Sequence, residues 1–129
     1  MAGELAWPIE QIPDDDFVFM RAHRVHFRQG KLGPGVFRAQ GEGMSVNWEK
    51  YASAEETRRQ ARRNPEENAI IRMSVLGIRR VDDLRVEHAP EIANRAHSEV
   101  YGLSGNPELT ELRVLLLRIA EIALPLTAS

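Results

Sequence analysis

Short runs in which apolar and polar residues alternate recur along this chain, and they constrain its fold more than any other feature of the sequence. In the run 17–25, for example, the alternation places Val18, Met20 and Ala22 on one face. A period of two residues is typical of strands that cover a core with one face. Gly and Pro residues separate the runs, so we expect short strands joined by turns. The predicted strands are 17–25, 36–38, 44–48, 69–78, 84–88 and 96–101.

A helix is predicted to begin at Ser53. Ser53 followed by Glu56 is a capping-box pattern, in which the hydroxyl and the carboxylate each bond a backbone N–H that the helix leaves unpaired. The helix is predicted to run to about Arg63, because Asn64 and Pro65 stop it.

A second helix is predicted over 107–124, where Asn106 suits the N-cap, Pro107 the first helical position, and Pro125 the end. Apolar residues cover well over half of its circumference, which is more than one contact with a sheet needs. Either the helix is sandwiched within its own domain, or part of it packs against another chain. The expected interface residues are Leu112, Leu115, Leu116, Ile119 and Ile122.

These elements predict an α+β fold, with a small, mostly antiparallel sheet, one short basic helix and an apolar C-terminal helix. The chain has 129 residues, the size of one domain, so we expect an N-terminal arm over 1–16 and a single domain over 17–129. The net charge of −2 is unevenly spread. Residues 1–16 hold five acids and no base, whereas 17–63 hold ten Lys or Arg and four Glu.

Composition excludes several classes of protein. The chain has no Cys, so disulfides, cysteine nucleophiles and cysteine-ligated zinc or iron–sulfur sites are excluded. The N-terminus lacks the basic and apolar regions of a signal peptide, and the most apolar run, 114–126, contains Arg118 and Glu121. We therefore expect a cytoplasmic protein without membrane association, and we predict no cofactor.

The candidate catalytic residues lie around two histidines that flank a Pro-containing loop, His88 and His97. These could act as acid and base in a His-dependent nuclease or phosphoesterase acting on RNA or a nucleotide, with Arg85 or Arg95 stabilising negative charge. His88, His97 and Glu99 are also the ligand types of a two-His, one-carboxylate metal site, but their spacing matches no specific zinc or iron motif, and no metal is predicted. The alternative is structural: His97 is a half-buried strand residue and His88 hydrogen-bonds loop backbone.

A candidate nucleic-acid site is formed by Arg58, Arg59, Arg62 and Arg63 on the predicted basic helix, with Trp48 placed to stack on a base. The alternative is a solvated helix face, since a cluster of cations near a helix C-terminus is favourable without any ligand.

Three segments together resemble a group of small uncharacterised bacterial proteins: the I-P-D-D start at Ile12, the S-V-x-W strand at Ser45, and the H-x-P…N-x-A-H segment from His88 to His97. The resemblance spans 12 to about 102. It implies a bacterial origin and a shared architecture, and it implies no activity. Residues 103–129 lie outside it and are interpreted as an addition for assembly.

The leading expectation is a small bacterial accessory or interaction protein. Its C-terminal helix would bind a second copy, giving a homo-oligomer, or a larger bacterial protein. The His-dependent enzyme and the nucleic-acid-binding module are the two alternatives, so whether the protein is an enzyme stays open at this point.

Overall fold

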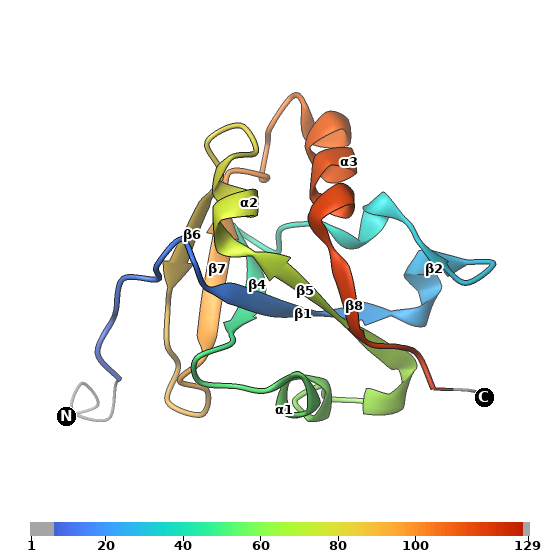
Figure 1. Ribbon diagram of the computed structural model, residues 1–129, viewed down its shortest axis with the longest axis horizontal. Coiled ribbons are helices and arrows are strands. Elements are labelled where there is room, and N and C mark those ends of the chain that lie inside the picture. The colour runs from blue at the N-terminus through green and yellow to red at the C-terminus, as the bar shows by residue number, and fades with distance from the viewer. Residues whose placement is uncertain (1–6, 128–129) are drawn as a thin grey trace.

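The computed structural model describes residues 7–127 and shows one antiparallel sheet with helices on both faces (Figure 1). Across the sheet the strand order is β6-β7-β4-β1-β5-β8, and a separate two-stranded ribbon pairs β2 with β3. Helices α2 and α3 lie on one face of the sheet and α1 on the other. The α+β fold class predicted from the sequence is confirmed.

The sheet consists of β1 (Phe17–His23), β4 (Gly43–Trp48), β5 (Asn68–Ser74), β6 (Arg85–His88), β7 (His97–Tyr101) and β8 (Glu121–Leu124). The ribbon consists of β2 (Phe27–Arg28) and β3 (Lys31–Leu32), and the helices are α1 (Ala54–Arg59), α2 (Val75–Arg79) and α3 (Leu109–Ile119). Short 3-10 turns lie at Arg24–His26, Pro34–Val36 and Pro65–Glu67.

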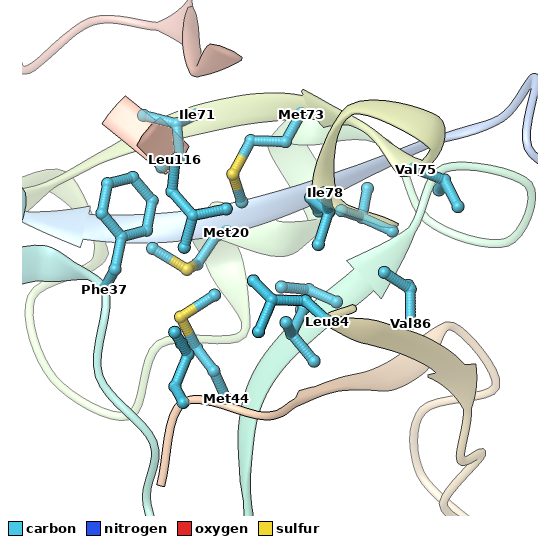
Figure 2. Packing of buried hydrophobic residues seen from close by; sticks show 14 of the residues in the cluster. Met20, Phe37, Met44, Ile71, Met73, Val75, Ile78, Leu84, Val86 and Leu116 are labelled. Atoms are coloured by element: carbon cyan, nitrogen blue, oxygen red, sulfur yellow. The ribbon is translucent and has the colours of Figure 1, made fainter. Parts of the chain in front are cut away.

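The main core lies between the sheet and the helices α2 and α3. Met20 of β1, Met44 of β4 and Ile71 of β5 point into it from the sheet (Figure 2). Ile78 of α2 and Leu116 of α3 lie among them, and each of these five side chains is buried. Burying one such side chain contributes about 1.5–3 kcal/mol. The alternation in β1 and β4 therefore selects the face that enters the main core, whereas Phe19 and Asn47 are buried on the other face of the sheet.

Helix α1 begins as predicted and ends early. Ser53 Oγ accepts a hydrogen bond from Glu56 N at 3.0 Å, and Glu56 Oε1 accepts one from Ser53 N at 2.8 Å, so the capping box is confirmed. The helix ends at Arg59 and does not reach Arg63. Thr57 is its one buried residue, and a helix without an apolar face gains little packing energy from further turns.

The stretch predicted as one strand over 69–78 is a strand followed by a helix. β5 ends at Ser74, whose hydroxyl accepts a hydrogen bond from Gly77 N at 3.0 Å and so caps α2. Val75 and Ile78 then face the core from the same side of α2, because residues three apart share a helix face. Over so few residues a strand pattern and a helix pattern coincide, and the sequence does not separate them.

The single C-terminal helix predicted over 107–124 is wrong at both ends. α3 begins at Leu109, and its N-cap is Glu108 and not Asn106, whose side chain accepts a hydrogen bond from Glu108 N at 2.8 Å. α3 ends at Ile119, Ala120 adopts an extended backbone, and β8 follows as an edge strand paired with β5. Ile122 lies opposite Ile71 and Leu124 opposite Ile70. The hydrogen bonds that form β8 come from a strand far earlier in the chain, so no local pattern indicates them.

The described part of the N-terminal arm, 7–16, is anchored to the domain at a few residues, while Ile9 is 78% exposed. Ile12 is buried with 2% of its surface exposed. Arg79 donates hydrogen bonds to the Ile12 carbonyl at 2.8 Å and to Asp14 Oδ1 at 2.7 Å, and Trp48 Nε1 donates to Asp16 Oδ2 at 2.8 Å. Over 7–127, no helix is both long enough and apolar enough to cross a membrane.

Candidate functional site

His88 is the last residue of β6 and is buried, with 3% of its surface exposed. Its Nδ1 accepts a hydrogen bond from the backbone N–H of Glu10 at 3.0 Å, so the proton lies on Nε2, which donates to the Arg95 carbonyl oxygen at 2.7 Å. The ring packs edge-on against Trp48, with 5.1 Å between ring centroids. Both nitrogens of His88 are therefore occupied by the backbone of the chain itself.

His97, the first residue of β7, is partly exposed and has a different environment. Its Nδ1 donates to the Ala89 carbonyl at 2.8 Å, and its Nε2 lies 3.3 Å from Ser45 Oγ and 3.2 Å from Glu99 Oε2. The Ser45 hydroxyl and the Glu99 carboxylate therefore both lie next to Nε2 of His97. In a hydrolase triad a carboxylate bonds the ring nitrogen remote from the nucleophile. In His97 that nitrogen, Nδ1, bonds the Ala89 carbonyl, and Glu91 Oε2 lies 3.9 Å from it, beyond hydrogen-bond distance. This group of side chains can offer hydrogen bonds at the surface, but it is not arranged as an activated nucleophile.

The structure does not bring the two histidines together. His88 lies opposite Ser98 in the β6–β7 pair, and His97 is the residue before Ser98. Opposite residues share a face and successive residues alternate, so the two imidazoles lie on opposite faces of the sheet. The geometry therefore lacks the shared phosphate site that the acid–base hypothesis requires. A metal site that includes both His88 and His97 lacks its geometry for the same reason, and residues 7–127 contain no group of three or more His, Asp or Glu side chains able to hold a metal ion.

The two arginines proposed beside the histidines are also separated in space. Arg85 is exposed at the start of β6, 3.0 Å from Glu87 Oε2, and its guanidinium lies over the Tyr101 ring. Arg95 lies over the ring of Tyr51, with 4.0 Å from its guanidinium carbon to the ring centroid. A shallow depression of about 400 Å³ beside Arg85 is lined by residues of the arm and of β6 together with Arg79 and Leu84, without any histidine.

Arg95 belongs to a cluster that fixes the arm, which we call the anchor cluster: Glu10, Lys50, Tyr51, His88 and Arg95. The Glu10 carboxylate accepts hydrogen bonds from Tyr51 OH and from Lys50 Nζ, the latter at 2.9 Å, and lies 3.5 Å from Arg95. The Tyr51 hydrogen bond, followed by that of Lys50, lowers the pKa of Glu10, and Glu10 in turn raises the pKa of Lys50. The one carboxylate of this cluster thus lies between two cations, Lys50 and Arg95.

A polar network under α1 is a second feature that the sequence analysis missed. Asn47 of β4 is buried, and its Nδ2 donates to Thr57 Oγ1 at 3.0 Å and to Gln60 Oε1 at 2.9 Å. Its Oδ1 accepts from Asn94 Nδ2 at 2.9 Å. The amide of Asn47 therefore ties both α1 and the loop between β6 and β7 to one face of the sheet. Its partners are distant in sequence, and no spacing indicates them.

The nucleic-acid site predicted on the basic helix needs correction. Because α1 ends at Arg59, Arg62 and Arg63 lie beyond it, and the four arginines do not share one helix face. Arg58 donates instead to the carbonyl oxygens of Asn68 and Pro125. Trp48 is 1% exposed, so its ring cannot stack on a base.

The predicted interface residues fall into two groups. Leu112 and Leu116 are buried in the chain's own core, at 2% and 0% exposure, so they cannot contact another chain without unfolding α3. Leu115 and Ile122 are 38% and 49% exposed, and Ile119 is partly buried. The surface left for a partner is narrower than predicted and includes a strand, β8, as well as the outer side of α3.

No protein-family model, curated protein or solved structure matches this chain. The resemblance to the small bacterial proteins remains a prediction.

Proposed function

We propose that this protein is a non-catalytic interaction protein that assembles with a second copy of itself through α3 and β8. The observation that carries the proposal is the position of β8 at the end of the six-stranded sheet, with Ile122 49% exposed. Among the described strands, only β5 pairs with it. The outer side of an edge strand presents N–H and C=O groups to which another strand can bond.

The helix that leads into this strand supports the proposal. Val114 and Leu115 of α3 are 40% and 38% exposed, whereas Leu112 and Leu116 on the same helix are buried in the core. The outer side of α3 therefore keeps apolar area that the fold of one chain does not cover. A contiguous exposed apolar patch often marks a binding site for a partner, whereas single exposed apolar residues scattered over a surface do not.

A second copy fits this surface for reasons of symmetry and charge. When two β8 strands pair antiparallel about a twofold axis centred on Ile122, each Ile122 lies beside its counterpart, because such an interface uses the same patch twice. Glu121 is the one charged residue of β8, and its carboxylate lies 3.9 Å from Arg72 of its own chain. No like charges then meet at the centre of the pair.

The use of the polar residues within the chain also supports a non-catalytic role. His88 and Asn47 are the buried residues whose side chains could best take part in catalysis. Their hydrogen bonds are all made within the chain, to the arm, to α1 and to the loop before β7. A small bacterial accessory protein of the cytoplasm is the role that we infer from these observations and from the predicted resemblance.

Sedimentation velocity over a concentration series tests this function. We expect the wild-type protein to shift from monomer to dimer with rising concentration, and Leu115→Glu and Ile122→Glu to remain monomeric. Ile92→Glu is the matched control, because Ile92 is 63% exposed but lies in the loop between β6 and β7. A wild-type protein that stays monomeric at the highest soluble concentration refutes the proposal, as does a control that dissociates as fully as the two test variants.

A further inference from the structure

The β2–β3 ribbon combines an exposed turn with an unusual charge arrangement. It projects from the end of the molecule remote from the N-terminal arm (Figure 1). Gln29 and Gly30 form its turn with φ of 52° and 78°, as a two-residue hairpin turn of type I′ requires. Arg28 and Lys31 lie directly opposite each other across the ribbon. Like charges placed opposite each other destabilise an antiparallel pair, so this arrangement needs a reason.

No carboxylate of residues 7–127 forms an ion pair with this ribbon. Residues 17–41 contain no Asp or Glu. Within the part of the chain that the structure describes, none of the four cations at this end of the molecule takes part in an ion pair: Arg24, Arg28, Lys31 and Arg38. Arg28, Lys31 and Arg38 are exposed, and the buried Nε of Arg24 has no hydrogen-bond partner among the described residues.

The titration of a neighbouring histidine shows the same excess of positive charge. The pKa of His26, which immediately precedes β2, is lowered by burial and then by the charges of Arg38 and His23. A cation is thus disfavoured at this position in part because other cations already surround it.

The acidic arm does not compensate for the ribbon. Three of the four carboxylates in its described part, residues 7–16, are bound elsewhere: Glu10 to Lys50 and Tyr51, Asp14 to Arg79, and Asp16 to Trp48. The arm and the ribbon lie at opposite ends of the molecule (Figure 1). A charge distribution of this kind orients a protein in the field of a polyanion.

We propose that the β2–β3 ribbon binds duplex DNA, with Arg28 and Lys31 at its tip and Arg24 and Arg38 at its base contacting phosphates. A two-stranded ribbon fits the major groove of B-form DNA, which is about 12 Å wide. The major groove of duplex RNA is too narrow for it. Single strands are bound through exposed aromatic rings, and Trp48, the aromatic residue predicted for this role, is buried. This inference concerns a surface separate from β8 and does not depend on dimer formation.

Fluorescence anisotropy with a labelled DNA duplex of mixed sequence, measured over a salt series, tests the proposal. Four phosphate contacts predict that log Kobs falls with log salt concentration with a slope of about −3 to −4. Replacing both tip residues, Arg28→Gln and Lys31→Gln, is expected to make that slope shallower by about 2. The control Arg59→Gln with Arg62→Gln removes the same charge from exposed positions in and after α1, and we expect it to bind almost as the wild type does.

A thermal melt separates lost binding from lost structure. The tip variant removes the Arg28–Lys31 repulsion, so its melting temperature is expected to equal or exceed that of the wild type. Three results would overturn the proposal: no binding of duplex DNA at low salt, an equal loss of binding in the control, or tighter binding of duplex RNA or single-stranded DNA than of duplex DNA. Binding that depends on the tip residues while the fold is intact supports it.

Discussion

Replacing His88 by Phe tests whether this histidine holds the fold together or is available for chemistry. The new ring keeps a similar shape against Trp48 and Tyr51, whose centroids lie 5.1 Å and 6.1 Å from that of His88. It removes the acceptor for Glu10 N–H and the donor to the Arg95 carbonyl. A buried backbone group that loses its partner costs about 1–3 kcal/mol. Glu10 and Arg95 are only partly buried, so we expect a total loss of about 2–4 kcal/mol.

Urea denaturation followed by tryptophan fluorescence measures this loss, because Trp48 lies against the replaced ring. His23→Phe serves as the control: the His23 side chain is 41% exposed, and its hydrogen bonds to Val25 N and Glu67 lie near solvent. Losing them is expected to cost no more than about 1 kcal/mol. If His88→Phe lowers the free energy of unfolding by no more than His23→Phe does, the structural assignment of His88 is refuted.

Two further predictions concern the anchor cluster and a turn. The folded-state pKa of Glu10 is lowered, so the stability that its carboxylate contributes is complete above its ordinary pKa of 4.5 and is lost as the pH falls through the lowered value. Glu10→Gln should therefore flatten the fall of the urea midpoint below about pH 4.5, and parallel curves for the two proteins would contradict this. Gly102 has φ of 118°, and a Cβ there would lie 2.7 Å from Leu84 Cδ2, so Gly102→Ala should cost about 1–3 kcal/mol in thermal denaturation. Gly105→Ala, with φ of 70° and open space around the new Cβ, should cost less, and an equal cost would contradict the packing argument.

The elements predicted correctly are those for which local chemistry is sufficient. Ser53 and Glu56 satisfy each other's backbone N–H groups within one helical turn, so the start of α1 follows from four consecutive residues. In β1 the pleat of the strand alone places Val18, Met20 and Ala22 together on the face of the main core. In both cases the deciding interactions lie within a few positions of one another in the chain.

The elements predicted incorrectly depend on partners far along the chain. β8 exists because the edge of β5 offers hydrogen bonds at Ile70 and Ile71, and this competes successfully with the helical pattern of the same residues. The candidate histidines illustrate the same limit. His88 and His97 are close together in the sequence, but the pairing of β6 with β7 places their side chains on opposite faces of the sheet.

By itself, the sequence determined the α+β class, the start of α1, the buried face of β1 and β4, and the uneven distribution of charge. These properties depend on local hydrogen bonding, on side-chain hydropathy and on composition, and all three are carried by neighbouring residues. Only the tertiary structure decided that His88 and Asn47 hold the fold together, that Arg28 and Lys31 face each other without a carboxylate from the described residues, and that residues 121–124 form an edge strand. The physical reason is that a hydrogen bond or an ion pair acts over a few ångströms in space, and its two partners can lie at any separation along the chain.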